Sequence, residues 1–260
     1  MGAFTDRTGE ININNFGSEM VIVEYRNARD IDVFFSEYDW TAKSVEYGKF
    51  KNGNVKCPYE PKVYNHGYIG EGKYKVSENG KKTKCYTIWQ HMLERCYDEK
   101  YHKKEPTYKN CAVDNNWLNF QNFAKWYYEN FYQIEEEKMC LDKDILNKGN
   151  KVYSDKTCVF VPNNINSLFT KSDKVRGKHP VGVCYNKAKK KFQAKCSVYD
   201  YDKNKKKLKH LGYYETPEQA FEVYKEFKEQ YIKEVADYYK KNIPDKLYNA
   251  MYEYKVNIDD

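Results

Sequence analysis

The segment Met139–Phe169 constrains the fold most, because its pattern predicts a strand, a polar loop, a second strand and a helix in direct succession. The first strand runs into two carboxylates, Asp142 and Asp144. The second strand, Cys158–Val161, is followed by an Asn-rich helix start over Asn163–Leu168. One hard cation can be held between an oxygen ligand on a strand and another on a helix. The segment therefore predicts a ββα unit with a metal site of the nuclease type.

Basic residues are concentrated in one part of the chain, whose formal net charge is +7. Residues 171–216 hold 14 Lys and Arg against 4 Asp and Glu, whereas residues 1–170 hold 24 of each kind. Such a block is typical of a surface that binds a polyanion, most simply nucleic acid, although a solvated charged face has the same composition. The 27 tyrosines offer apolar area with a polar tip, for packing or for contact with a partner.

The sequence carries no export or membrane signal. Met1–Glu10 is polar and lacks an apolar core, and no run of about 18 apolar residues predicts a membrane helix. The 8 cysteines are scattered singly without a CxxC pair, which is typical of reduced thiols in a cytoplasmic protein. Four of them, Cys96, Cys111, Cys140 and Cys158, could alternatively form a structural zinc site. We expect a cytoplasmic protein with no membrane partner.

Residues 1–75 predict a small β-rich module. Met20–Tyr25 and Ile31–Phe35 are two β-rich runs that predict a hairpin, and a third strand is expected around residues 50–55. The Gly- and Tyr-rich stretch Tyr64–Tyr74 predicts a loop whose backbone can approach a partner. The pattern NFGSEMVIVEY, DIDVFF and KFKNGNVKCP resembles the small all-β DNA-binding module found beside nuclease domains in bacteriophage proteins.

Residues 76–170 combine helices with the ββα unit. Apolar residues recur at helical spacing over Thr87–Tyr97 and over Trp117–Phe131, and Asn116 or Asn119 is a candidate N-cap for the second helix. The frame W..M..RCY, YKNCAV, W.NF.NFAKWY, LDKDI, VYS..TCVFVP and IN resembles the HNH endonuclease family, in the form carried by phage homing-type nucleases. The resemblance implies a ββα-metal fold and metal-dependent cleavage of DNA.

The resemblance also implies roles for individual residues. Asp142 matches the first-strand carboxylate that ligates the divalent cation, one Mg²⁺ or Mn²⁺ ion, and Asn166 matches the helix position of the second metal ligand. Lys143 stands where the family usually has its general-base histidine. Thr157 stands where the family commonly has the Asn or His that orients this base.

The lysine weakens the case for catalysis. A lysine with a pKa of ~10.4 is unsuited to deprotonating water near neutral pH, so Lys143 would instead bind the scissile phosphate or stabilise charge. His102, in a polar loop, and His91, on a helix, are the candidate bases.

Residues 171–260 predict a small sheet followed by a helix. Three strand patterns occur in succession: Val181–Asn186, Lys191–Tyr199 and Lys207–Tyr214. The helix is expected from Pro217 to about Lys240, with Thr216 as its N-cap.

The pattern GVCY, FQAKC and HLGYYETPEQA resembles the AP2-type DNA-binding domain. In that family the exposed face of the sheet enters the major groove of double-stranded DNA. The resemblance implies five candidate contacts: Arg176, Gln193, Lys195, Ser197 and Lys209. Arg and Lys can bond guanine and Gln can pair with adenine, while the other lysines would contact phosphate.

Together these patterns predict an α+β chain of three modules: a β-rich DNA-binding module over 1–75, an HNH-nuclease-like domain over 76–170, and an AP2-like domain with a helical extension over 171–260. Three functions remain open. The protein is a phage-type DNA endonuclease in the cytoplasm of a bacterial host, or a DNA-binding protein that has lost cleavage and acts as a regulator or inhibitor, or a protein that binds another nucleic-acid enzyme. Ile243–Tyr254 either packs back on the core or forms a dimer contact, so monomer and homodimer both remain open.

Overall fold

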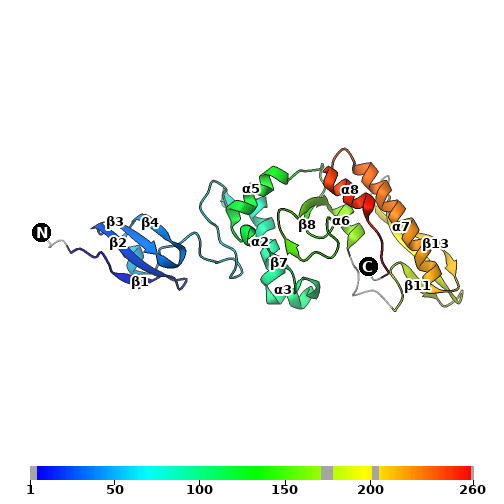
Figure 1. The fold of residues 1–260 in the computed structure, drawn as a ribbon, viewed down its shortest axis with the longest axis horizontal. Helices are drawn as coiled ribbons and strands as arrows, with labels where there is room; N and C mark the ends of the chain where they lie inside the picture. The colour runs from blue at the N-terminus through cyan, green and yellow to red at the C-terminus, as the bar shows by residue number, and fades with distance from the viewer. Residues whose placement is uncertain (1–4, 171–177, 201–204, 259–260) are drawn as a thin grey trace. The chain divides into compact units, whose positions relative to one another are not determined.

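The computed structural model describes residues 5–170, 178–200 and 205–258, and it confirms the α+β class (Figure 1). The chain divides into two compact units. Unit 1 comprises Met1–Glu129 and Lys151–Asp155, and unit 2 comprises Asn130–Asn150 and Lys156–Asp260. The division between the units falls inside the range 76–170, so that range contributes to both. No helix in the described part of the chain is both long and apolar enough to cross a membrane.

Unit 1 begins with an antiparallel sheet in the order β1-β2-β3-β4. Its strands are β1 Ile11–Ile13, β2 Glu19–Asn27, β3 Asp30–Phe35 and β4 Trp40–Val45. The predicted hairpin is therefore confirmed as β2 and β3. The strand expected around residues 50–55 is wrong, because Phe50 lies in the short helix α1, Tyr47–Lys51, which buries its ring in the core of this sheet.

The rest of unit 1 is mainly helical. Its elements are the hairpin β5 Ser77–Glu78 and β6 Lys81–Lys82, then α2 Lys84–Tyr97, α3 Glu99–Lys104, β7 Ala112–Val113, α4 Asn115–Leu118, α5 Phe120–Asn130 and β9 Val152–Tyr153. Strands β7 and β9 pair in parallel although about 40 residues of chain separate them. The single helix predicted over Trp117–Phe131 is divided at Asn119, whose side chain accepts a hydrogen bond from the Gln121 amide.

The Gly- and Tyr-rich loop Tyr64–Tyr74 packs inside unit 1. A Cβ on Gly67 would lie 2.3 Å from Leu93 Cδ1, and a Cβ on Gly70 would lie 2.4 Å from Asn119 Oδ1. The backbone of Tyr68 bonds to the turn between α4 and α5. These glycines therefore serve close packing within unit 1.

Unit 2 contains the predicted ββα layout. β8 Met139–Asp142 pairs antiparallel with β10 Val159–Pro162, and α6 Asn163–Phe169 follows directly. The second part is an antiparallel sheet in the order β11-β12-β13, with β11 Val183–Asn186, β12 Lys191–Asp200 and β13 Lys205–Tyr214.

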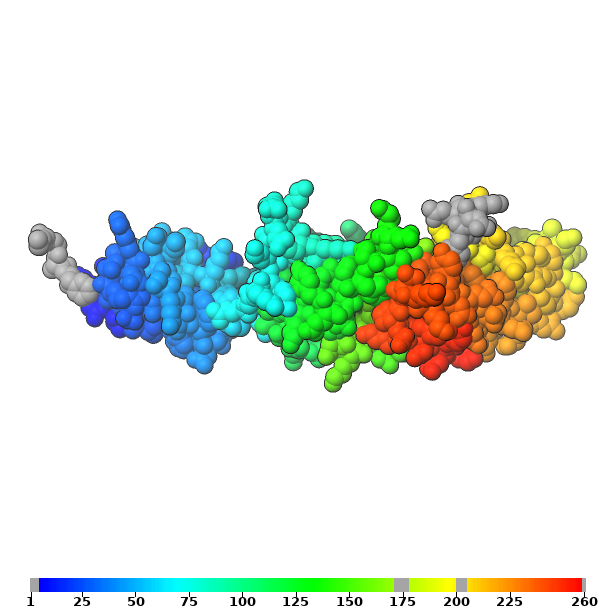
Figure 2. All heavy atoms as spheres, turned by 90° about the horizontal axis from the view of Figure 1, so that it is seen from above, coloured from blue at the N-terminus to red at the C-terminus, as the bar shows by residue number. Residues whose placement is uncertain are grey.

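Two helices complete unit 2, α7 Pro217–Tyr239 and α8 Asp245–Glu253. Thr216 is confirmed as the N-cap of α7, and it forms a capping box with Gln219. The helix α8 packs on α7, and Leu247 and Met251 are fully buried in a core shared with β10, α6 and α7 (Figure 2, α8 in red against α7 in orange). The segment Ile243–Tyr254 therefore packs back on the core of unit 2.

Candidate functional site

Asp142 organises the turn that follows β8. Its Oδ1 accepts hydrogen bonds from the backbone amides of Asp144, at 2.9 Å, and Ile145, at 2.7 Å. Burial and repulsion by the Asp144 carboxylate raise the pKa of Asp142 to about 6, and the two backbone hydrogen bonds only partly offset this. The carboxylate thus caps a turn, which is a common structural use of Asp.

Lys143 is turned into the protein. The residue is only 6% exposed, and its Nζ lies 3.1 Å from Asp144 Oδ2. The backbone carbonyl of Lys143 accepts a hydrogen bond from Asn150 Nδ2 at 2.7 Å, which ties both sides of the loop together. The ammonium therefore provides a positive charge within the turn, where the nuclease pattern would provide a base.

The other two predicted catalytic residues, Asn166 and His102, have different surroundings in the described part of the chain. Asn166 is half-buried in α6, and its side chain makes no hydrogen bond to any residue that the structure describes. The helix starts beside Met139, because the Asn163 amide donates to the Lys138 carbonyl. His102 belongs to α3 of unit 1, and its Nε2 lies 2.9 Å from the Arg95 carbonyl.

The donors around Asp142 do not fit a divalent cation. Mg²⁺ and Mn²⁺ prefer a near-octahedral set of oxygen ligands. One oxygen of Asp142 is occupied by two amide donors, and the Asp144 carboxylate is paired with an ammonium. Across the described ranges, no three His, Cys, Asp or Glu side chains are grouped to hold a metal, which also argues against the zinc alternative. The cysteines there are free thiols.

Substitutions at Asp142 test its capping role and the cost of its ionisation. The pKa of this carboxyl rises from 3.8 to about 6 on folding, so the folded state binds more protons between about pH 4 and pH 6. Protonation of Asp142 therefore stabilises the folded state fully below pH 4, and this stabilisation is lost as the pH rises through 6. Asp142→Asn keeps the oxygen acceptor but cannot ionise. We expect this variant to exceed wild type in unfolding free energy by about 1–3 kcal/mol at pH 8.

Urea denaturation at pH 4.5 and at pH 8 provides the measurement, with Asp142→Ala as the matched variant. The alanine leaves two amides of the turn without an acceptor, so it should be about 1–2 kcal/mol less stable than Asp142→Asn at either pH. An asparagine variant that is less stable than wild type at pH 8 would show that the ionised carboxylate stabilises the turn.

The sheet of unit 2 presents a second candidate surface. Ala194, Cys196 and Val198 of β12 are buried, whereas the alternate residues lie on the side away from α7. The register of β13 extends this second side by three cross-strand pairs: Gln193 with Tyr213, Lys195 with His210, and Ser197 with Leu208. We call this side, with Lys206 opposite Tyr199, the outer face.

Lys209 lies on the opposite side of the sheet from the outer face. It pairs with the buried Cys196, and its Nζ lies 4.6 Å from the ring centroid of Phe227 on α7. A bulge at Leu211 shifts the register between Ala194 and Lys195 and so sets this orientation. Arg176, the fifth predicted contact, lies outside the described residues.

Some polar groups of the outer face have partners within the protein, and others can bind an external ligand. Gln193 Nε2 lies 2.9 Å from His210 Nδ1, and Lys191 pairs with Glu215 at 2.6 Å. Lys195 and Lys206 form no ion pair with any residue in the described ranges, so their ammonium groups remain free to bind an external anion. Lys206, His210 and Tyr213 were not predicted, although the register of β13 would have identified them.

Comparison with protein-family models, with curated proteins and with solved structures gave no match.

Proposed function

We propose that this protein binds nucleic acid, most simply double-stranded DNA, through the outer face of the β11-β12-β13 sheet, and that the Asp142 turn does not cleave it. The observation that carries the proposal is the charge of that face. Lys195 and Lys206 project from neighbouring strands without a carboxylate at any described outward position of β12 or β13. Unpaired lysines on a sheet face suit the phosphate backbone, which provides affinity without sequence.

The same face contains groups that can read bases. The His210 and Tyr213 rings lie 4.6 Å apart, and His210 is bonded to the Gln193 amide. A side-chain amide can pair with adenine, and aromatic rings can stack on exposed bases. We propose binding without cleavage because Asp142 and Lys143 of the turn already have partners within the protein.

A salt titration tests the proposal. Fluorescence anisotropy with a labelled duplex should show binding at low salt, with a slope of log K against log[salt] of about −3 or steeper. Supercoiled plasmid incubated with the protein and Mg²⁺ or Mn²⁺ should remain uncut. Failure to bind the duplex at low ionic strength would contradict the proposal. Nicking that disappears in Asp142→Ala would assign the turn to a nuclease instead.

A further inference from the structure

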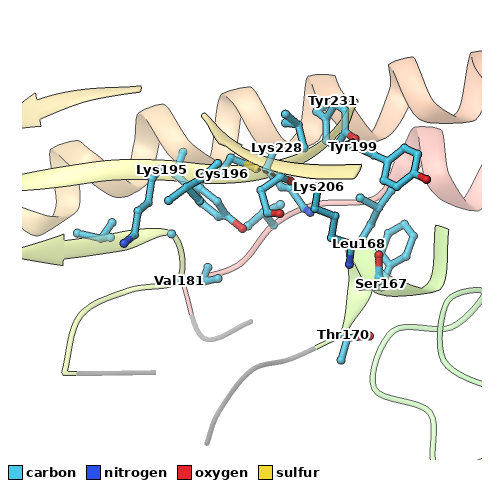
Figure 3. Close-up of a pocket in the computed structure, with 18 of the residues that line it drawn as sticks. Ser167, Leu168, Thr170, Val181, Lys195, Cys196, Tyr199, Lys206, Lys228 and Tyr231 are labelled. Atoms are coloured by element: carbon cyan, nitrogen blue, oxygen red, sulfur yellow. Dashed lines mark hydrogen bonds between the residues drawn. The ribbon is translucent and has the colours of Figure 1, made fainter. Parts of the chain in front are cut away.

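Unit 2 contains an open cavity of about 470 Å³ beside the free edge of β12 (Figure 3). Strand β11 pairs only with Lys191–Ala194, so the rest of β12 has no strand on that side. There the Tyr199 amide donates to the hydroxyl of Tyr231 at 2.7 Å. The end of α6, the segment 179–184, α7 and the residues Tyr254 and Val256 complete the wall. The volume is in the range of small-molecule sites.

The wall of this cavity is cationic. Lys195 of β12, Lys206 of β13 and Lys228 of α7 all line it, together with His179. The described lining residues include no Asp, Glu or Arg. The remaining wall is mainly aromatic and aliphatic, and it includes Tyr224. An apolar wall that carries a few charges of one sign is suited to an organic anion.

Lys228 is the most unusual of these residues. It is only 9% exposed and lies on the face of α7 that also carries Tyr224, Tyr231 and Val235. Burial lowers the pKa of Lys228, and repulsion by Lys206 acts in the same direction, while Cys196 acts against them. No hydrogen bond or ion pair joins its ammonium to any residue that the structure describes. Lys228 lines the cavity, so an anion bound there would offset the cost of placing this cation in a mostly buried position.

We propose that this cavity binds a phosphate monoester, with the phosphate between Lys206 and Lys228 and the organic part against the tyrosine and valine side chains. Lysines are compact point charges that can surround a dianionic phosphate, whereas a planar carboxylate is better matched by the fork of an arginine. The Ser197 hydroxyl, which bonds to no described residue, is a further donor at the wall. The phosphate monoester is either a free nucleotide or the terminal phosphate of a DNA strand.

Calorimetric titration of the full chain tests the chemistry of the ligand. The probes are dAMP, deoxyadenosine, and one short oligonucleotide with either a 5′-phosphate or a 5′-hydroxyl. The expected result is that dAMP binds at least about tenfold more tightly than deoxyadenosine. A free nucleotide as ligand predicts equal affinity for the two oligonucleotides, and a strand end predicts preference for the phosphorylated one. Equal affinity for dAMP and deoxyadenosine, or no binding of either phosphorylated probe, would overturn the proposal.

Variants on α7 locate the site. Lys228→Met replaces the buried ammonium by an apolar chain of similar length, and it should weaken dAMP binding by about 10- to 100-fold while the protein stays folded. Lys225→Met, on the same helix but away from the cavity, is the control and should change the affinity by less than about twofold. The exposed Lys206→Met is a second variant that leaves the core intact. Wild-type affinity for dAMP in both Lys228→Met and Lys206→Met would exclude this site.

The proposal for the cavity and the proposal for the outer face can be refuted separately. Lys228 is buried, so Lys228→Met should leave duplex affinity unchanged even though it removes nucleotide binding. Nucleotide binding in a protein that does not bind duplex DNA would overturn the proposed function alone. Duplex binding by a protein that does not bind dAMP would overturn the cavity proposal alone.

Discussion

Charge reversal at two positions of the outer face, in Lys195→Glu/Lys206→Glu, is expected to lower the affinity for duplex DNA by about 100-fold or more at ~0.1 M salt. Each substitution removes an unpaired ammonium and places a carboxylate where a phosphate should lie. Both residues are on neighbouring strands of one sheet, so both substitutions should weaken the binding of the same duplex. Fluorescence anisotropy over a salt series measures the affinity and the slope, which should become less steep by about 2.

A variant with the same change in net charge is the control for this result. Lys241 and Lys246 are exposed in unit 2, after α7 and within α8, and they are not part of the outer face. Lys241→Glu/Lys246→Glu should lower the affinity by less than about threefold, because screening limits the reach of a charge to about 10 Å at this ionic strength. An equal loss in both double variants would mean that the overall charge of the protein, rather than the outer face, determines binding.

Gly182→Ala is expected to lower the unfolding free energy by about 3 kcal/mol or more. Gly182 has φ +76, and a Cβ at this position would lie 2.1 Å from Cδ2 of Tyr224. The Tyr224 ring is buried between α7 and the sheet, so the added Cβ would have to displace an aromatic ring from its packing in the core. The alanine therefore combines an unfavourable backbone conformation with an overlap in the core.

Gly149→Ala separates these two costs, because Gly149 has a similar φ of +82 but no heavy atom within 4 Å of the added Cβ. It should lose only the backbone term, about 1–2 kcal/mol. Urea denaturation of both variants gives the comparison. Equal losses at the two positions would show that backbone conformation, not the approach to Tyr224, requires the glycine at 182.

Local sequence signals predicted several elements well. The β-rich runs of β2 and β3, the helical spacing in α7 and its Thr216 cap depend on residues close together in the chain, so their structure could be predicted from pattern alone. The ββα layout has the same origin, because its strands and helix follow one another directly. Most of the elements that the sequence predicted correctly are local in this sense.

The details of the site depend on contacts that sequence patterns do not contain. Counting alternate residues along β13 places Lys209 on the wrong side of the sheet, because one extra residue at Leu211 reverses the direction of the side chains that precede it. Asp142 shows a related ambiguity. An Asp that caps a turn and an Asp that binds a metal have the same local sequence, and only the hydrogen bonds of the folded chain distinguish them.

Lys228 illustrates burial that the sequence conceals. A lysine on a long amphipathic helix is normally expected at the surface, and its ammonium normally reaches water. The sequence signal for its burial is its position four residues after Tyr224 and three before Tyr231, on the apolar stripe of α7.

The pairing of β9 with β7 has a consequence for genetic dissection of the protein. The chain passes from one unit to the other three times, after Glu129, after Asn150 and after Asp155. No single truncation therefore yields an intact half. A fragment beginning at Asn130 would keep Val152 and Tyr153 without the strand Ala112–Val113, and it would expose the Tyr153 ring, which is 2% exposed in the full chain. Point substitutions in the complete chain are thus the better tool for assigning activities to each unit.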